Sequence, residues 1–466
     1  MTLISSISGI RGTIGGEIGN NLTPFDIVKY VSAYVTFLRE KDPQKRLRIV
    51  VGRDGRISGT MVNSIVCGTL QSMGADVIDL GLSTTPTVEI SVVNLEADGG
   101  IIITASHNPI QWNALKLLRN NGEFISNEEG LKIQEWAKSA NFTYSEAQKL
   151  GNYTLYENAI ADHIEKILQL EWVDVDAISR ANFNVAVDAI NSTGGIAISQ
   201  LLKKLGVNHI TILNGEPTGI FAHNPEPLPE HLTEISNLID NGHFDVGFVV
   251  DPDVDRLAII MENGEMFGEE YTLVAIADYI LQNQKGNTVS NLSSTRALRD
   301  ISEKYGVSYA ASAVGEVNVV EKMKETNAII GGEGNGGVIL PALHYGRDAL
   351  VGIALFLTHL AKSKKSCRQL KSQYPSYFIS KNKIELKPDL NVPYILDRIA
   401  EKYKSYQINR IDGVKIDFED SWIHLRASNT EPIIRIYAEA SCMTIAGNLA
   451  KKIVNDIKEI IIEQKI

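Results

Sequence analysis

Cysteine is scarce in this sequence. Only three cysteines occur among 466 residues, at the widely spaced positions Cys67, Cys367 and Cys442. No CxxC pair is present, so the sequence predicts neither a zinc site nor a disulfide framework. Isolated cysteines of this kind are typical of small side chains that pack in a reducing compartment.

Long apolar runs and an excess of positive charge are lacking as well. The longest apolar stretch, residues 349–357, is too short to span a bilayer. The N-terminus has no basic segment followed by an apolar one, so we expect no signal peptide and a cytoplasmic location. The net charge of −11 argues against nucleic acid or an anionic membrane as the main partner. An anionic substrate would have to be attracted by local basic groups.

Alternating strand and helix patterns fill most of the chain. The length suggests about three or four domains. The first round of the pattern predicts strands at 48–52, 77–80 and 101–104 and a helix at 60–73. Similar rounds start near residues 183 and 259. This alternation favours mostly parallel sheets covered by helices.

The C-terminal part has a different pattern. Residues 413–418 and 422–427 are typical of a hairpin, and residues 433–438 form a further predicted strand. A long helix over 443–464 closes the chain. These elements predict a smaller α+β unit after the alternating part.

The most informative motif is Thr-Ala-Ser-His-Asn-Pro at residues 104–109, directly after the apolar run 100–103. A buried strand that ends in such a turn exposes the hydroxyl of Ser106 on a fixed backbone. A serine hydroxyl is a poor nucleophile unless a base or a metal activates it. His107 is a candidate base or phosphate contact, but neighbours in an extended segment point to opposite sides, which favours the phosphate contact. A capped turn without function is the alternative.

A second predicted strand end carries Asp251, Asp253 and Asp255. Three carboxylates at alternate positions suit one hard divalent cation. The spacing also opens an EF-hand loop, but Arg256 occupies the position that needs glycine, so we reject that interpretation. Three aspartates leave metal positions open for a phosphoryl oxygen, and Arg256 is a candidate to hold the phosphoryl group.

A glycine-rich loop occupies residues 331–337. Its glycines fit the GxGxxG spacing, but Glu333 lies between the first two and would repel a pyrophosphate. Glu333 and Asn335 are better suited to sugar hydroxyls, and a plain flexible loop remains the alternative.

The fourth motif spans residues 426–435 and combines two arginines, two hydroxyls and an amide. This set of donors suits a phosphate dianion, whereas a hairpin turn with incidental arginines is the alternative. Weaker signals are Arg11 between glycines, the possible ion-pair turn Arg53-Asp54-Gly55-Arg56, and Lys116 ten residues after Ser106.

In their order along essentially the whole chain, these four motifs resemble those of the α-D-phosphohexomutases, which include phosphoglucosamine mutase and phosphomannomutase/phosphoglucomutase. The resemblance implies an α/β fold with three related mixed α/β domains plus a smaller C-terminal α+β domain around a central cleft. We expect the serine domain at 1–152, the metal-loop domain at 153–257, the sugar-loop domain at 258–373 and the phosphate-binding domain at 374–466.

The resemblance also implies residue roles. Ser106 would carry the phosphoryl group and, with Asp251, Asp253 and Asp255, bind Mg²⁺. Lys116 and Arg11 match basic positions proposed for proton transfer. The residues expected to bind the sugar are Glu333 and Asn335, and those expected to bind the substrate's own phosphate are Arg426, Ser428, Asn429, Thr430 and Arg435.

The sugar loop departs from the pattern of many relatives, which have Gly-Glu-x-Ser-Gly-His. Here Asn335 replaces the serine and Gly337 the histidine, and Glu316 stands where some relatives place histidine. The Gly-Glu-Gly-Asn-Gly-Gly form resembles an archaeal type of phosphoglucosamine mutase.

We therefore expect a phosphohexomutase that interconverts hexose 6-phosphate and hexose 1-phosphate through a phosphoserine and a bisphosphate intermediate, with glucosamine phosphate as substrate. Mg²⁺ and a sugar 1,6-bisphosphate activator are the expected cofactors, and the protein is expected to be a monomer or homodimer. The alternatives are a phosphomannomutase/phosphoglucomutase of broader specificity, a metal-dependent sugar phosphatase, and a non-catalytic sugar-phosphate sensor.

Overall fold

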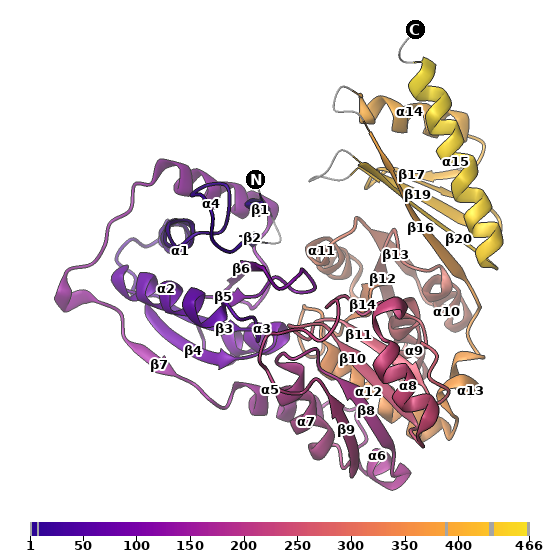
Figure 1. Ribbon diagram of the computed structural model, residues 1–466, viewed down its shortest axis with the longest axis horizontal. Helices are drawn as coiled ribbons and strands as arrows, with labels where there is room; N and C mark the ends of the chain where they lie inside the picture. The colour runs from indigo at the N-terminus through magenta and orange to yellow at the C-terminus, as the bar shows by residue number, and fades with distance from the viewer. Residues whose placement is uncertain (1, 7–8, 387–389, 428–432, 464–466) are drawn as a thin grey trace. The chain divides into compact units, whose positions relative to one another are not determined.

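The computed structural model describes residues 2–6, 9–386, 390–427 and 433–463. The chain forms two compact units. The first unit consists of residues 1–272 and 336–370, and the second of residues 273–335 and 371–466. The ribbon in Figure 1 labels the elements of both units.

The N-terminal domain of the first unit is built on a mixed sheet. Its strands are β1 (Ile4–Ser6), β2 (Gly9–Thr13), β3 (Arg48–Arg53), β4 (Asp76–Leu82), β5 (Gly99–Ile103), β6 (Trp112–Arg119) and β7 (Tyr153–Leu155). They lie in the order β1-β2-β6-β5-β3-β4-β7. β3 is parallel to β4 and β5, whereas β6 runs antiparallel to β5 and β2. The sheet is more mixed than the strand–helix alternation predicts, because a short turn joins β5 to β6 and forces them to run antiparallel.

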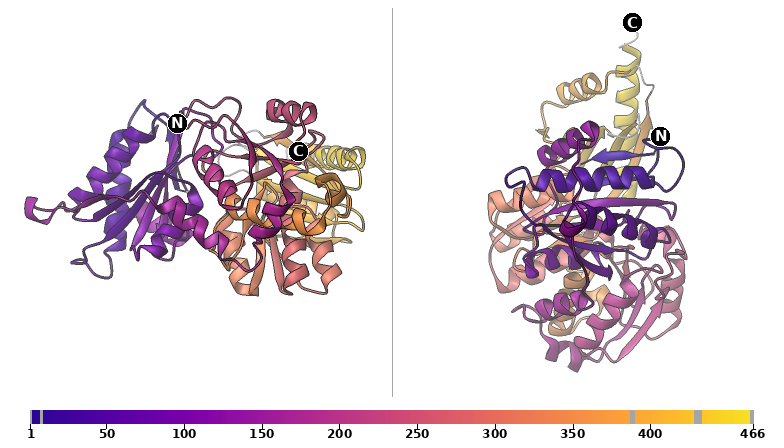
Figure 2. Two further views of the ribbon diagram at one scale, coloured as in Figure 1. Left: turned by 90° about the horizontal axis from the view of Figure 1, so that it is seen from below. Right: turned by 90° about the vertical axis from the view of Figure 1, so that its left-hand side faces the viewer.

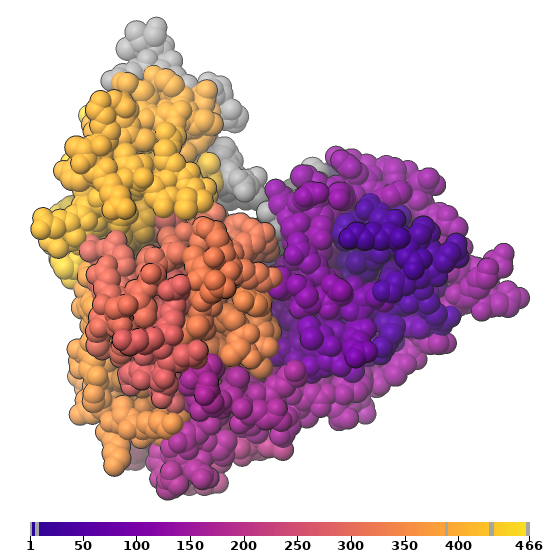
Figure 3. Space-filling view, turned by 180° about the vertical axis from the view of Figure 1, so that it is seen from behind, coloured from indigo at the N-terminus to yellow at the C-terminus, as the bar shows by residue number. Residues whose placement is uncertain are grey.

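Helices cover both faces of this sheet. On one face lie α1 (Pro24–Leu38), α2 (Gly59–Ser72) and α4 (Asn127–Ser139), and on the other α3 (Thr85–Asn94) and α5 (Ala159–Leu168). Thr23 and Asp26 form a reciprocal capping box that begins α1, with Pro24 in the first turn. Val31, Val66 and Ile101 are fully buried between helices and sheet, and each such burial contributes about 2 kcal/mol. In the space-filling view the indigo N-terminal residues lie among purple residues of the same domain (Figure 3).

The second domain of this unit has strands β8 (Asn184–Asp188), β9 (His209–Leu213), β10 (Val246–Val250) and β11 (Leu257–Met261), in the order β11-β10-β8-β9. β8 is parallel to β9 and β10, and β10 is antiparallel to β11. Its helices are α6 (Val175–Ala181), α7 (Gly194–Lys204) and α8 (Thr233–Asn241). Ile235 and Ile239 of α8 pack against the sheet. All five residues of β10 are buried, which fixes the backbone from which the acidic motif begins.

The rest of the first unit is β15 (Gly337–Ile339) and α12 (Ala349–Ser363). Twelve consecutive residues of α12, from Ala349 to Leu360, are buried, because the helix packs on α5, α6 and α7. The apolar run 349–357 is therefore a core helix. Among the described residues no helix is both long and apolar enough to cross a membrane.

The second unit contains the parallel strands β12 (Asn287–Asn291), β13 (Tyr309–Ser312) and β14 (Ala328–Glu333), in the order β13-β12-β14. Helices α10 (Ala297–Tyr305) and α11 (Glu316–Thr326) pack on these strands. Helix α9 (Glu269–Asn283) precedes them, and the short helix α13 (Cys367–Lys371) lies further along the chain.

The C-terminal domain, also in the second unit, is an antiparallel sheet. Its strands are β16 (Phe378–Glu385), β17 (Gln407–Asn409), β18 (Val414–Asp417), β19 (Trp422–Ala427) and β20 (Ile433–Ala440), in the order β16-β20-β19-β18-β17. Helices α14 (Val392–Lys402) and α15 (Met443–Glu463) cover one face (Figures 1 and 2). Ile395, Ile399, Ile453 and Ile457 of these helices form the core with the sheet. The predicted hairpin and closing helix are confirmed.

Candidate active site

Ser106 lies on a turn that begins where the buried strand β5 ends. Its φ is +47°, in the left-handed region that few residues other than glycine adopt. The backbone N–H of Ser106 donates to Thr104 Oγ1 at 2.9 Å. The Ser106 hydroxyl donates to Asp251 Oδ2 at 2.6 Å. The turn thus presents the hydroxyl directly to the acidic motif of the second domain, within the first unit.

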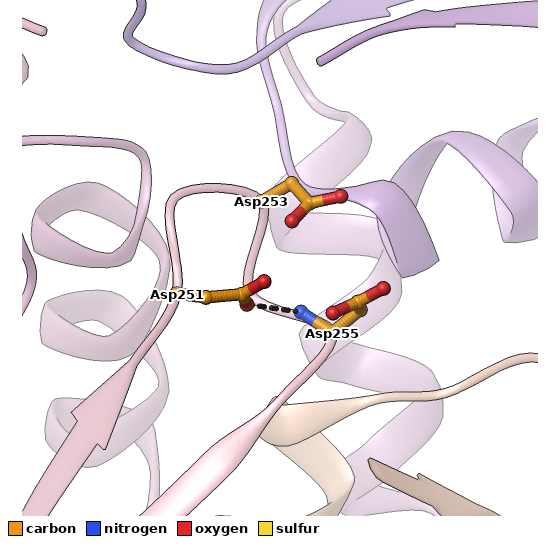
Figure 4. A group of neighbouring side chains, drawn as sticks. All are labelled: Asp251, Asp253 and Asp255. Carbon is orange, nitrogen blue, oxygen red and sulfur yellow. Dashed lines mark hydrogen bonds between the residues drawn. The ribbon is translucent and has the colours of Figure 1, made fainter. Parts of the chain in front are cut away.

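The acidic motif forms the loop between β10 and β11. Figure 4 shows the carboxyl groups of Asp251, Asp253 and Asp255 turned toward one another around this loop. All three residues are fully buried. Asp251 Oδ1 accepts the backbone N–H groups of Asp255 and Arg256, each at 3.2 Å. Val254 has a φ of +62°, so the loop turns sharply enough to bring the alternate side chains together.

This loop fits a divalent cation. One ligand oxygen from each aspartate lies within 4.8 Å of the others, and the described residues contain no other such group of His, Cys, Asp and Glu ligands. Within the described residues, Asp253 Oδ1 and Asp255 Oδ1 are buried without a hydrogen-bond partner. Burial, followed by the charges of Asp255 and Asp253, raises the pKa of Asp251 well above its usual range. A hard cation would satisfy the bare oxygens and offset that repulsion.

Lys116 places a cation against the acidic loop. It lies on β6, and its Nζ is 2.8 Å from Asp253 Oδ2 and 3.9 Å from Asp255 Oδ2. Burial alone would lower the pKa of Lys116, but the charges of Asp253 and Asp255 outweigh it and raise the pKa above its ordinary value. Lys116 is therefore an ammonium throughout the physiological range. For Asp253, burial is likewise outweighed by Lys116, which holds the pKa of this carboxyl below its usual range.

Two contacts of the acidic loop were missed by sequence reasoning. Arg347 Nη2 lies 2.6 Å from Asp255 Oδ2, and Thr85 Oγ1 donates to Asp253 Oδ2 at 2.6 Å. Thr85 begins α3, and Arg347 lies just before α12. The sequence feature that could have pointed to Arg347 is the polar stretch 344–348 in front of an apolar helix. Nothing in the sequence distinguishes Thr85 from other threonines that begin helices.

His107 lies closer to the Ser106 hydroxyl than the sequence predicts. Its Nδ1 is 3.3 Å from Ser106 Oγ. The expectation that neighbouring side chains point to opposite sides is wrong here, because the positive φ of Ser106 breaks the extended conformation. Burial, and then the nearby charges of Arg256 and Arg347, place the pKa of His107 well below its usual value. The ring is therefore neutral near pH 7.

The other basic candidates of this unit flank the same elements. Arg256 directly follows the acidic loop, and its Nη1 is 3.7 Å from Glu226 Oε1. Arg11 on β2 is paired with Ala114 on β6, two residues before Lys116. Because paired residues and i, i+2 residues share a face of a sheet, Arg11 and Lys116 lie on the same face.

The remaining candidates lie in the second unit. Glu333 is 4% exposed, and its Oε1 accepts the Asn291 side-chain amide at 2.8 Å and the Gly315 N–H at 3.0 Å. Asn335 is partly exposed two residues further on. The glycine-rich loop is thus tied to the carboxyl end of β12 through Glu333.

Arg426 and Arg435 are brought together by the C-terminal sheet. They are directly paired across β19 and β20, and Arg426 Nη1 is 3.6 Å from Asp412 Oδ2. Like charges placed opposite one another in a sheet are destabilising, which favours an anion between or beside them. Ser428, Asn429 and Thr430 lie outside the described residues.

Comparisons with known proteins match the chain in four consecutive segments. Family models for phosphoglucomutase/phosphomannomutase alpha/beta/alpha domains I, II and III match residues 4–144, 161–264 and 268–377, and the model for the C-terminal domain of the same proteins matches residues 386–455. Three α/β domains and a smaller C-terminal domain are therefore confirmed, while the boundaries given above stay predictions.

Similar sequences and structures cover nearly the whole chain. A phosphoglucomutase/phosphomannomutase from Thermococcus kodakarensis is 36% identical over 93% of both chains. A phosphoglucosamine/phosphogalactosamine mutase from Sulfurisphaera tokodaii is 34% identical over 97% of this chain and 98% of its own.

Solved structures share the fold. The crystal structure of a phosphoglucomutase/phosphomannomutase family protein from Burkholderia thailandensis has a TM-score of 0.82 at 23% identity, over 98% of both chains. A putative phosphomannomutase from Thermus thermophilus has a TM-score of 0.81 at 24% identity, over 99% of both chains. Together with the four matched domains and the two sequence relatives, this likeness places the chain in the phosphoglucomutase/phosphomannomutase family.

Proposed function

We propose that this protein is a phosphohexomutase, an isomerase that interconverts hexose 6-phosphate and hexose 1-phosphate through phosphorylated Ser106. The observation that carries the proposal is the 2.6 Å contact between the Ser106 hydroxyl and Asp251, the first of three buried carboxylates, in a chain of this family. Phosphorylated Ser106 donates its phosphoryl group to a sugar monophosphate. The resulting bisphosphate turns over and returns its other phosphate to Ser106.

The acidic loop is the proposed metal site. Asp251, Asp253 and Asp255 would hold Mg²⁺, together with an oxygen of the phosphoryl group on Ser106. When bound, the cation supplies positive charge to the phosphoryl oxygens during transfer. Arg347 occupies only one oxygen of Asp255, so the other oxygen stays free for a metal.

The chain's own cations would neutralise the transferred group. Lys116 is held as an ammonium beside Asp253, which favours charge neutralisation over a role as a base. Arg256 and Arg11 add guanidinium groups on neighbouring elements. When phosphorylated Ser106 gives up its phosphoryl group, the sugar hydroxyl loses a proton and Ser106 Oγ gains one. In the return transfer the Ser106 hydroxyl loses that proton and the sugar oxygen gains one. His107, neutral and 3.3 Å from Ser106 Oγ, is suited to carry a proton at the serine oxygen.

The second unit would select and hold the sugar. We propose that Glu333 and Asn335 contact sugar hydroxyls. Arg426, Ser428, Asn429, Thr430 and Arg435 would grip the phosphate that is not transferred. Support for the phosphate grip comes from the cross-strand pair of arginines: Asp412 offsets part of their repulsion, and a bound phosphate would offset more of it.

Glucosamine phosphate is the proposed substrate. The relative from Sulfurisphaera tokodaii is named a phosphoglucosamine/phosphogalactosamine mutase, and a relative from Pyrococcus horikoshii that is 31% identical is named a probable phosphoglucosamine mutase. The alternative is a phosphomannomutase/phosphoglucomutase of broader specificity, which the name of the Thermococcus kodakarensis relative favours. A sugar 1,6-bisphosphate activator, a cytoplasmic location, a monomer or homodimer and the absence of nucleic-acid or membrane partners also stay proposals.

Coupled assays with the 1- or 6-phosphates of glucosamine, glucose and mannose test the activity. We expect the highest kcat/KM with glucosamine phosphate. Intact mass of the wild type after treatment with bisphosphate should show one added phosphoryl group that Ser106→Ala lacks. Release of inorganic phosphate without isomerisation would favour the phosphatase alternative. Binding of hexose phosphate without any turnover by the wild type would favour the sensor.

A further inference from the structure

Arg56 is a buried arginine that the proposed chemistry does not use. It follows β3 in the turn Asp54-Gly55-Arg56 and is 1% exposed. Its Nε is 3.1 Å from Asp54 Oδ2, and its other nitrogens donate to four backbone carbonyls of the Ser106 turn. These are the carbonyl oxygens of Ser106 at 2.5 Å, Asn108 at 2.6 Å, Pro109 at 2.8 Å and Trp112 at 2.9 Å.

This arrangement fixes the backbone of the serine on both sides. Arg56 holds the Ser106 carbonyl, while Asp54 accepts the Thr104 hydroxyl at 2.6 Å. Thr104 Oγ1 in turn accepts the Ser106 N–H. Four carbonyl oxygens that lie close together repel each other unless a cation lies between them. The planar guanidinium group of Arg56 supplies both the positive charge and the N–H donors for these oxygens. The left-handed conformation of Ser106 is thus imposed by its surroundings.

The same turn is tied to the acidic loop. The N–H of Gly55 donates to Ser192 Oγ at 2.9 Å, and the Ser192 hydroxyl donates to the carbonyl of Pro252 at 2.6 Å. Pro252 lies between the first two aspartates of the acidic loop. A Cβ on Gly55 would come within 2.9 Å of Ser192 Cα, so only glycine permits this approach. The Thr193 hydroxyl also donates to the carbonyl of Pro252, at 3.0 Å.

We infer that the turn Asp54-Gly55-Arg56 sets the spacing between the nucleophile and the acidic loop, with Arg56 and Ser192 as positioning residues. A hydrogen bond joins the Ser106 carbonyl to Arg56, the peptide bond joins Arg56 to Gly55, and two further hydrogen bonds lead from Gly55 through Ser192 to Pro252 beside Asp251. Neither residue touches the reacting atoms. The inference rests on the proposed function, because the spacing matters only if Ser106 and the acidic loop act together.

Substitution of Arg56 tests one end of the path. Arg56→Lys keeps the charge but cannot reach four carbonyls, so Ser106 should shift relative to Asp251. A shift of about 1 Å would lower kcat by about 100-fold, while KM for the sugar phosphate should change by less than a factor of about two. Misplaced phosphoserine should also lose phosphate to water more often per turnover. Arg46→Lys is the matched control, since Arg46 pairs with Asp76 on the exposed side of the same domain.

Substitution of Ser192 tests the other end and carries less risk of misfolding. Ser192→Ala removes the bridge to Pro252 and leaves the rest of the turn intact, so we expect kcat to fall about tenfold with KM nearly unchanged. Thr193→Ser, which keeps its hydroxyl on Pro252, should behave as the wild type. Because both residues act through one spacing, the double variant Arg56→Lys/Ser192→Ala should lose less than the product of the single losses.

Crystal structures of the wild type and Ser192→Ala give a readout that does not depend on activity. We expect the Ser106 Oγ to Asp251 Oδ2 distance to lengthen in the variant. An unchanged distance, or wild-type kcat in Ser192→Ala and Arg56→Lys, would overturn the inference. A wild type that never phosphorylates Ser106 would instead contradict the proposed function, and the distance comparison would still decide the positioning role.

Discussion

At the scale of single residues, the site joins groups from turns far apart in the sequence. Ser106 and Asp251 are separated by 145 positions, yet each follows a buried strand and their side chains are hydrogen bonded. The sequence predicts both turns, because an apolar run followed by polar, turn-forming residues marks a strand end. It cannot predict which oxygens meet, since that depends on how the second domain packs against the first.

The position of His107 and the contact of Arg347 with Asp255 could not be predicted from the sequence. The position of His107 depends on one backbone angle of Ser106, which no pattern of residue types specifies. Arg347 contacts Asp255 across 92 residues of sequence, and a single arginine before a helix has no signature of its own. Long-range contacts of individual side chains are set by packing, so they appear only in the structure.

Removal of the Lys116 charge should impair transfer more than binding. Lys116→Met leaves the phosphoryl group without its nearest ammonium, and loss of such a group costs about 100- to 1000-fold in kcat. Steady-state kinetics against sugar phosphate measures this effect. Lys116→Arg keeps the charge beside Asp253 and should retain more activity than Lys116→Met. Equal activity of the two variants would show that charge at this position is not what matters.

The acidic loop should govern the metal requirement. Asp255→Asn would remove one of the three proposed charged ligands, so the Mg²⁺ concentration for half-maximal activity should rise by roughly tenfold or more. Titration of Mg²⁺ into protein stripped with EDTA, followed by activity and by calorimetry, measures both consequences. Glu262→Gln, just after β11 and outside the loop, is the control. Full activity after EDTA treatment would argue against the metal site.

At the scale of secondary-structure elements, the patterns predict the strands β5 and β10 that precede the serine turn and the acidic loop, but not β2 and β6, which carry Arg11 and Lys116. The expected strand at 48–52 matches β3 to within one residue, and the expected helix at 60–73 is shifted from α2 by one residue. Helices α1 and α3 were not predicted. Eight of the ten residues of α3 are buried, including Glu89 and Ser91, so its polar residues do not mark an exposed face and the helical periodicity is hidden.

A buried ionic network joins three of these elements. His344 lies 3.2 Å from Glu89 of α3 and 3.4 Å from Asp348, which caps α12. Asp348 also lies 2.9 Å from His163 of α5. Burial alone would lower the pKa of His344, but hydrogen bonds to Asp348 and Glu89 raise it to about 10. Arg347, whose side chain contacts Asp255, directly precedes Asp348 in the chain.

Because of this network, the free energy of unfolding should fall as the pH becomes alkaline. The pKa of His344 is about 10 in the folded protein and about 6.5 in the unfolded chain. The stabilisation is therefore fully present below pH 6.5 and is lost as pH rises toward 10. Urea unfolding at pH 6.5 and pH 9.5 should show a lower free energy of unfolding at the higher pH, by about 2 kcal/mol or more. The same comparison in His344→Gln should show a smaller difference, and an equal difference would exclude His344 as the source.

At the scale of the whole molecule, the proposed phosphoryl-transfer residues and the proposed sugar- and phosphate-binding residues belong to different compact units. Ser106, the acidic loop and their cations belong to the first unit, whereas Glu333, Arg426 and Arg435 belong to the second. The order of motifs predicts four domains, and the four family matches confirm this number. The arrangement of the units around a common cleft stays a prediction, because no local pattern in the sequence specifies it.

This division predicts that variants of the second unit change substrate binding. Arg426→Gln would remove the proposed charged hydrogen bond to the non-transferred phosphate, so KM should rise by about 10- to 100-fold. Transfer of a phosphoryl group to Ser106 from a small donor such as acetyl phosphate should remain. Arg410→Gln, whose arginine pairs with Asp397 in the same unit, is the control. An unchanged KM in Arg426→Gln would contradict the assigned phosphate grip.

The separation of Ser106 from Asp251 in the chain has a consequence for biosynthesis. The ribosome makes the serine turn 145 residues before its acidic partner, and all three carboxylates of the proposed metal site come late, from one short loop between paired strands. A nascent first domain therefore carries Ser106 and its neighbour His107 without the carboxylates of the acidic loop. An incomplete chain that ends before the acidic loop would therefore lack the proposed metal site and could not carry out metal-assisted transfer.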